Sequence, residues 1–269
     1  MKLAFLIALT LSLNSAFGGV CEDRKKKVST AISKSDSKKN LADIKSKSYE
    51  LVILGEPHGT HYLEKLPSII DLLTKDLKCA FIEQPHQLEQ NEIDQLLEGR
   101  KTKHFQTNAS FDYIPFFKYL RQRKVEIIPI DNRLDHPDGI SPLDYMTKRD
   151  DGMYDAIKQN LKRCGKSLYV VGKHHLTPDI SGYDETLGHR LKADLEEKVL
   201  IVDMIARKNM EEEYCSYSQN NLFDGRNILL KGNSVGNLSY STFVNNSFWS
   251  DFDYILHLKR EIGSQIEFD

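Results

Sequence analysis

From residue 49 onward, short apolar runs alternate with longer stretches in which apolar residues recur every three or four positions. Nearly continuous apolar runs are typical of strands buried on both faces, and the intervening 3.6-residue period is typical of amphipathic helices. The pattern predicts an α/β fold in a single domain, with a mainly parallel sheet covered by helices on both faces. The expected strands are 51–54, 79–83, 125–131, 167–172 and 198–205, with two short candidates at 227–231 and 253–258. The expected helices begin at about Tyr62 and then span about 88–98, 112–124, 142–162 and 186–197.

Composition limits the class of protein. The chain has 269 residues, 40% of them hydrophobic and 28% charged, which suits one sizeable core and excludes a disordered or fibrous chain. Lys and Arg number 37 against 39 Asp and Glu, a formal charge of −2. Because nucleic-acid binders usually carry a basic excess, we expect no nucleic-acid partner. No linker or fixed-period repeat interrupts residues 49–269, and nothing in the pattern indicates an oligomeric state.

The first 18 residues are predicted to be a signal peptide. Lys2 precedes an apolar run that is too short for a good membrane span, and Ala16 and Gly18 suit the small positions of a cleavage site after Gly18. We therefore expect an exported protein, periplasmic or extracellular, without a transmembrane segment. Val20 fits a lipobox poorly, so we do not expect lipidation at Cys21.

Residues 19–48 form a polar, Lys/Ser-rich lead-in to the domain. Val28, Ile32 and Leu41 are apolar positions that could support a weak helix. The composition favours a solvated lead-in over a membrane-binding patch.

Four cysteines follow the predicted cleavage site, an even number that allows two disulfides with three pairings. They are Cys21, Cys79, Cys164 and Cys215. Free thiols fit equally well, and Cys79 could simply be a small buried residue at the start of a strand. The wide spacing, without a Cys-x-x-Cys pair, argues against a thiolate zinc site.

Ionisable residues follow the carboxyl ends of the first four expected strands. The first strand leads into Gly55-Glu56-Pro57-His58, the second ends at Glu83, the third at Asp131, and the fourth leads into Gly172-Lys173-His174-His175. Ligands of open parallel sheets bind at this edge, so these side chains are expected to form one site. The Gly-x-x-His element occurs twice, each time directly after an apolar strand, where glycine permits a sharp turn or a close approach to the backbone. A carboxylate ending an apolar strand, such as Glu83, needs a partner or water.

Taken together, these elements resemble the erythromycin esterase/ChaN/TraB–Tiki superfamily. The resemblance is carried by GEPHG after LVIL, by FIEQP, by the IIPID strand, by KRDDGM at 148–153 and by VVGKHHL. It covers about residues 50–176, and DYILHL is similar to the family's last strand. The positions that match the family's motifs are Glu56, His58, Glu83, Arg149, Asp150 and His175, and Asp131, from the end of the third strand, completes the candidate site.

The resemblance implies hydrolysis of an ester or peptide bond in a small-molecule or peptide substrate, by one of two routes. In the first route, His58, Glu83 and His175 would hold a divalent metal ion that activates water. The second route needs no metal: His58 would activate water, Glu83 or Glu56 would orient it, and Arg149 would stabilise the oxyanion. The sequence leaves both routes open.

ChaN-like members of the superfamily imply another function, a non-catalytic haem- or metal-binding protein for uptake. Tyr62 or His61 would then supply the iron ligand. A haem pocket needs apolar walls and few carboxylates, whereas four carboxylates are expected here. That density favours hydrolysis.

Overall fold

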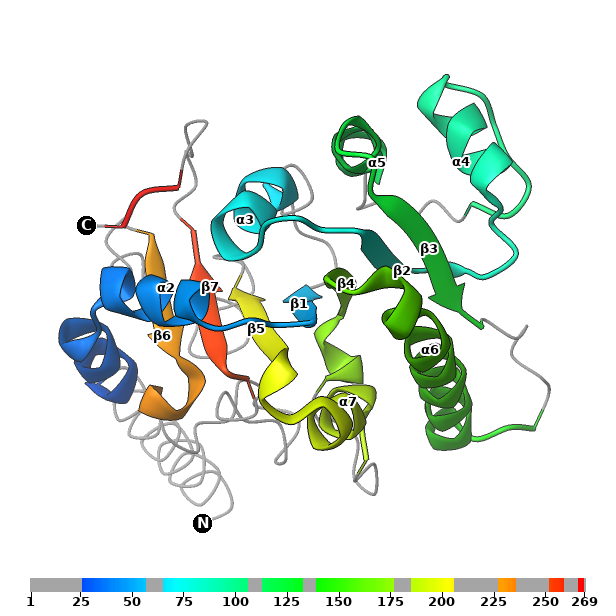
Figure 1. The fold of residues 1–269 in the computed structure, drawn as a ribbon. Coiled ribbons are helices and arrows are strands. Elements are labelled where there is room, and N and C mark those ends of the chain that lie inside the picture. Colours follow the sequence, from blue (N-terminus) through cyan, green and yellow to red (C-terminus); the bar gives the residue numbers. More distant parts are fainter. Residues whose placement is uncertain are drawn as a thin grey trace, which may run out of the picture.

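The computed structural model describes residues 26–56, 65–105, 113–132, 139–176, 185–205, 227–235, 252–258 and 266–268. Their strands form one seven-stranded sheet in the order β3-β2-β4-β1-β5-β7-β6 (Figure 1). All neighbouring pairs are parallel except β6 and β7, which are antiparallel. The predicted α/β fold with a mainly parallel sheet is confirmed.

The strands of the sheet are β1 (Leu51–Glu56), β2 (Cys79–Pro85), β3 (Glu126–Asp131), β4 (Ser167–Gly172), β5 (Val199–Ile205), β6 (Ile228–Lys231) and β7 (Tyr254–His257). The α-helices are α2 (Ser37–Ser46), α3 (Leu66–Leu73), α4 (Gln90–Leu97), α5 (Tyr113–Gln122), α6 (Pro142–Cys164) and α7 (Leu187–Leu195). A further helix spans 26–34, and a 3₁₀ turn, η2 (Lys173–His175), follows β4. Each predicted strand after residue 49 is present.

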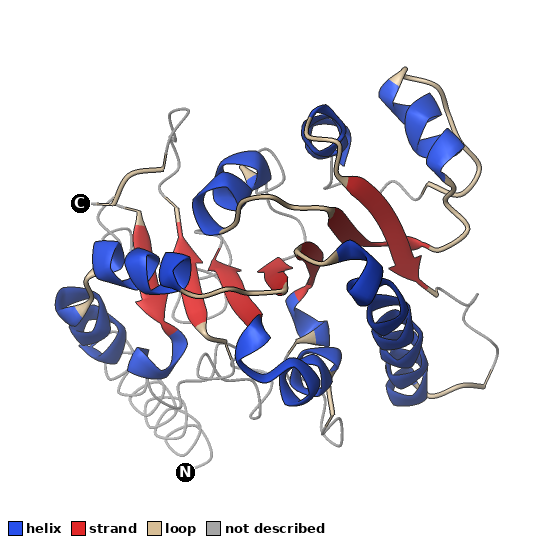
Figure 2. Ribbon diagram, in the orientation of Figure 1, coloured by secondary structure: helices blue, strands red, loops and turns tan. Residues whose placement is uncertain are grey.

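Helices cover both faces of the sheet, as Figure 2 shows. Alternation along each strand sends successive side chains into two separate cores. On one face, Val52 and Leu54 of β1 belong to a core with apolar residues of α2, α3, α4 and α5. On the other, Leu51 and Ile53 share a core with residues of α6, α7 and the 26–34 helix.

The N-terminal segment wraps around the β6 edge of the sheet. Val28 and Ala31 are buried in the core of one face, whereas Ile44 of α2 is buried in the core of the other. Side chains of α2 hydrogen-bond to the backbone on the open edge of β6. Leu229 N donates to Ser37 Oγ (3.0 Å), and Leu229 O accepts from Asn40 Nδ2 (2.8 Å). The expectation of a solvated lead-in is therefore wrong for these residues. The apolar positions of this segment are sparse, but they pack into the cores on both faces of the sheet.

A disulfide joins Cys79, the first residue of β2, to Cys164, the last residue of α6, with the two Cα atoms 5.5 Å apart. The sequence left free thiols open, and for this pair the interpretation of Cys79 as only a small buried residue is wrong. The bond fixes the end of α6 to the amino end of β2. Cys21 and Cys215 lie outside the described residues.

No helix in the described parts of the chain has both the length and the apolar character that crossing a bilayer requires. The predicted signal peptide and the start of the first expected helix at Tyr62 lie outside those parts.

Candidate functional site

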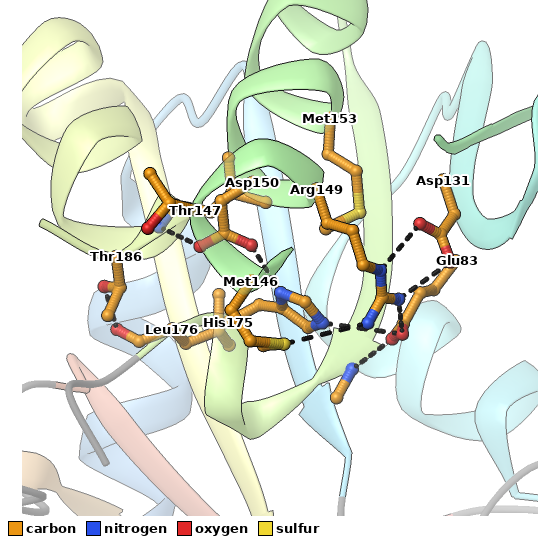
Figure 3. A network of polar contacts seen from close by, with 12 residues as sticks. Glu83, Asp131, Met146, Thr147, Arg149, Asp150, Met153, His175, Leu176 and Thr186 are labelled. Carbon is orange, nitrogen blue, oxygen red and sulfur yellow. Dashed lines mark hydrogen bonds and ion pairs between the residues drawn. The ribbon is translucent and has the colours of Figure 1, made fainter. Parts of the chain in front are cut away.

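The carboxyl ends of β2, β3 and β4 meet the first half of α6 in a buried network of charged side chains (Figure 3). Five of the seven predicted site residues belong to it. They are Glu83, Asp131, Arg149, Asp150 and His175. All five are buried, and Asp131 has no exposed surface at all.

Arg149 joins the ends of two neighbouring strands. Its Nε and Nη2 donate to the two carboxylate oxygens of Asp131 at 3.0 and 2.8 Å, a bidentate pair. The same Nη2 donates to Glu83 Oε1 at 2.8 Å, while Gly172 N donates to Glu83 Oε2 at 2.9 Å. The guanidinium and the β4 backbone therefore hold the Glu83 carboxylate from two sides.

His175 is the second cation of the network. Its Nδ1 donates to Asp150 Oδ1, and its Nε2 lies 3.5 Å from Glu83 Oε1, longer than a normal N–H···O hydrogen bond. The imidazole ring is thus fixed at Nδ1 and held more loosely at Nε2. His174 beside it is exposed, so the structure distinguishes two histidines that the sequence does not.

Helix α6 presents both Arg149 and Asp150 to the site because its start and packing are well defined. Ser141 caps it by accepting from Asp144 N at 3.0 Å, and Pro142 occupies its first turn. Asp150 also accepts from Leu187 N at 2.9 Å, which connects the first turn of α7 to the His175 partner. Asp150 is therefore held between the His175 ring and the backbone of α7.

The charges control one another's protonation. Burial alone would lower the pKa of His175, but the charge of Glu83 and the hydrogen bond to Asp150 raise it to about 10. Burial would raise the pKa of Glu83, but His175 and then Arg149 hold it well below its usual value. Hydrogen bonds and charge from Asp131 and Glu83 raise the pKa of Arg149 despite burial. At neutral pH the cations of His175 and Arg149 thus both face the ionised carboxylate of Glu83.

Glu56 is the sixth predicted site residue that the structure describes. Glu56 ends β1, is 4% exposed, and pairs in register with Gly172 of β4. Alternation places it on the face of Val52 and Leu54, opposite to Gly55. Gly55 itself permits a close approach, because a Cβ there would lie 2.8 Å from Leu176 Cδ1. His58 lies outside the described residues, as do His61 and Tyr62.

The described donors do not fit the predicted metal site of His58, Glu83 and His175. His175 Nδ1 is bonded to Asp150, which leaves only Nε2 for a ligand, and the Arg149 guanidinium that donates to Glu83 Oε1 would repel a cation placed between Glu83 and His175. Both oxygens of Glu83 already accept hydrogen bonds. Among the described residues, no three His, Cys, Asp or Glu side chains are arranged to hold a metal ion.

The sequence reasoning missed the contribution of α7. Thr186, its N-cap, donates to Leu176 O at 3.1 Å, and a Cβ at Gly188 would lie 2.7 Å from the same oxygen. A glycine two residues after a helix cap was the available signal. Also missed were two buried residues near the same sheet edge, Asp203 of β5 and His257 of β7. An aspartate within the apolar run KVLIVDMI was the same signal that identified Glu83.

Comparison with known proteins supports the fold. No family model matches the chain, and no curated protein matches it by sequence. A crystal structure of a Bacillus cereus protein is similar with a TM-score of 0.62 and 12% identity, covering 88% of this chain and 97% of that one. At this identity the similarity establishes a common fold and nothing further.

Two weaker structural similarities are to proteins with named properties. ChaN of Campylobacter jejuni, described with cofacial haem binding, has a TM-score of 0.43 and 13% identity over 84% of this chain and 93% of that one. RRSP, a MARTX toxin effector domain from Vibrio vulnificus, has a TM-score of 0.41 and 20% identity. It is matched over 62% of this chain and 37% of its own.

Proposed function

We propose that the protein is an exported hydrolase that cleaves an ester or peptide bond without a metal ion. The observation that carries the proposal is the position of His175. It is a buried imidazolium, clamped by Asp150 at one nitrogen and only loosely engaged by Glu83 at the other. In the proposal, the Nε2–H, which makes only a long contact with Glu83, donates to a substrate oxygen on which negative charge develops.

The role proposed for Arg149 differs from the one expected from the sequence, which was to stabilise the oxyanion. Its Nε and Nη2 are occupied by Asp131 and Glu83, so its role is to position Glu83 rather than to bind the oxyanion. His175 takes over the stabilisation of the oxyanion. Since His175 and Arg149 stay protonated and Glu83 stays ionised at neutral pH, the base that activates water must come from outside the network. Glu56 and His58 fill that role in the proposal.

Export is part of the proposal. The Cys79–Cys164 disulfide supports it, because disulfides persist mainly in oxidising compartments. The signal-peptide pattern of residues 1–18 points the same way.

Hydrolysis of chromogenic esters and fluorogenic peptides by the purified exported protein, with and without a chelator, tests the proposal. We expect activity that resists chelation and that falls at least about a hundredfold in His175→Asn, the size of a lost oxyanion donor. His174→Asn is the matched control, because that neighbour is exposed and should keep full activity. Far-UV circular dichroism checks that both variants fold.

Other results would overturn the proposal. Activity lost on chelation and restored by a divalent ion would favour the metal route. A Soret band on haem addition, in a protein that cleaves neither class of substrate, would favour a haem binder. Equal losses in the two histidine variants would remove His175 from the site.

A further inference from the structure

A hollow of about 820 Å³ lies where the N-terminal segment wraps around the β6 edge of the sheet. Its walls come from the 26–34 helix, the start of α2, the end of β6 and the η4 turn (Gly232–Val235) that follows β6. Among the described residues, five lysines line it against one acidic residue, Asp36. The lysines are Lys26, Lys27, Lys34, Lys39 and Lys231.

The acidic group does not neutralise this lining. Asp36 caps α2 by accepting from Lys39 N at 2.9 Å. Lys231 lies 3.5 Å from Asp43, which is outside the lining. Among the described residues, no ion pair includes Lys26, Lys34 or Lys39. Several like charges thus face one concavity, which focuses a positive potential within it.

The walls of the hollow are held in place by contacts made beneath it. Asn40, which is buried, donates to Leu229 O at 2.8 Å, and Ser35 Oγ donates to the same oxygen at 3.2 Å. Val28 and Ala31 anchor the 26–34 helix in the core. The lysine ammonium groups are therefore mounted on packed elements rather than on a free tail.

We propose that this hollow, the lysine pocket, binds a small polyanion that carries several phosphate groups. Its volume suits a ligand of drug size, between about 300 and 1,000 Å³. Lysines act as point charges with three donors each, which suits tetrahedral oxyanions, and the described lining residues include no arginine for planar bidentate recognition. Because the lining is concave, it favours a small ligand that can enter the hollow rather than a flat lipid surface.

The lysine pocket is distinct from the charged network that ends β2 and β4. Five strand spacings separate β2 from β6 in the sheet order, about 24 Å. Binding at the lysine pocket is therefore proposed independently of the hydrolase function, and its failure would leave that function untouched.

Titration calorimetry of the purified protein with sodium tripolyphosphate tests the proposal. We expect saturable 1:1 binding that weakens steeply between about 50 and 300 mM NaCl. The double variant Lys34→Glu/Lys39→Glu should bind at least about tenfold more weakly, because two attractive charges become repulsive. Lys118→Glu/Lys162→Glu is the matched control: it makes the same charge change at exposed positions of α5 and α6. It should change affinity less than twofold.

Three results would overturn the proposal. These are the absence of saturable binding, equal weakening in both double variants, and binding to phosphatidylglycerol vesicles without binding to tripolyphosphate. The last would identify the lysines as a membrane-contact surface. Thermal unfolding of each variant without ligand checks that the charge reversals leave the fold intact.

Discussion

Asp150 helps Glu83 to keep His175 charged, because Asp150 accepts a direct hydrogen bond from the ring and is itself anchored by Leu187 N. Replacing it with asparagine keeps the shape and removes the carboxylate. We expect Asp150→Asn to lower the pKa of His175 from about 10 by roughly 1 to 2 units, since Glu83 still raises it. An NMR titration of the His175 ring measures this. Asp151→Asn, at an exposed neighbour paired with Arg190, should leave that pKa unchanged.

His175 also links the stability of the fold to pH. Because the folded state raises the pKa of His175 from 6.5 to about 10, its contribution to stability is complete below about pH 6.5 and is lost as pH rises toward 10. We expect the free energy of unfolding to fall by about 2 to 4 kcal/mol across that range. Urea unfolding at pH 6, 8 and 10 tests the slope. If the free energy of unfolding of Asp150→Asn falls with pH as steeply as that of the unchanged protein, groups other than His175 cause the pH dependence.

At the scale of the element, the strands could be read from the sequence because apolar runs of this length leave few alternatives. The strand 167–172 is predicted to the residue, and α6 extends only to Cys164 beyond the expected 162. Glu83, Asp131 and His175 could be grouped because parallel strands end at one edge. The hydrogen bonds that these side chains make with α6 could not be predicted, since they depend on which turn of α6 faces that edge.

The close packing of α7 on the His175 turn depends on a missing side chain. A Cβ at Gly188 would lie 2.7 Å from Leu176 O and 2.8 Å from Leu176 Cα, both backbone atoms that cannot turn away. A Cβ at Gly152 of α6 would lie 3.1 Å from Asn132 Cβ, a tight contact that a shift of a few tenths of an ångström relieves. Alanine improves helix propensity by about 1 kcal/mol at either site. We therefore expect Gly188→Ala to lower the free energy of unfolding by about 1 to 3 kcal/mol, measured by urea unfolding, and Gly152→Ala to be nearly neutral. Equal effects would show that α7 can shift without cost.

For the molecule as a whole, the sequence could not show that the segment before β1 packs against the sheet or which cysteines form the disulfide. A Lys/Ser-rich segment reads as solvated, because burying Val28, Ala31 and Ile44 depends on an open strand edge that only the assembled sheet provides. The disulfide partners are similarly hidden, since Cys79 and Cys164 are 85 residues apart and three pairings were open. Both features are properties of the sheet order rather than of any local pattern.

The disulfide should stabilise the molecule without controlling its site. Closing an 85-residue loop removes chain entropy from the unfolded state that corresponds to about 4 to 5 kcal/mol. Cys164 ends α6, whereas Arg149 lies 15 residues earlier, about 22 Å along the helix. The intervening turns are held by Met153, Ile157 and Leu161 in the core.

We therefore expect Cys79→Ala/Cys164→Ala to lower the free energy of unfolding by an amount near that estimate, while the pKa of His175 stays within about 0.3 units of its original value. Denaturant unfolding and the His175 titration measure the two quantities. A shifted His175 pKa in a folded variant would mean that the far end of α6 does govern the charged network, and the disulfide would then belong to the site's control as well as to its stability.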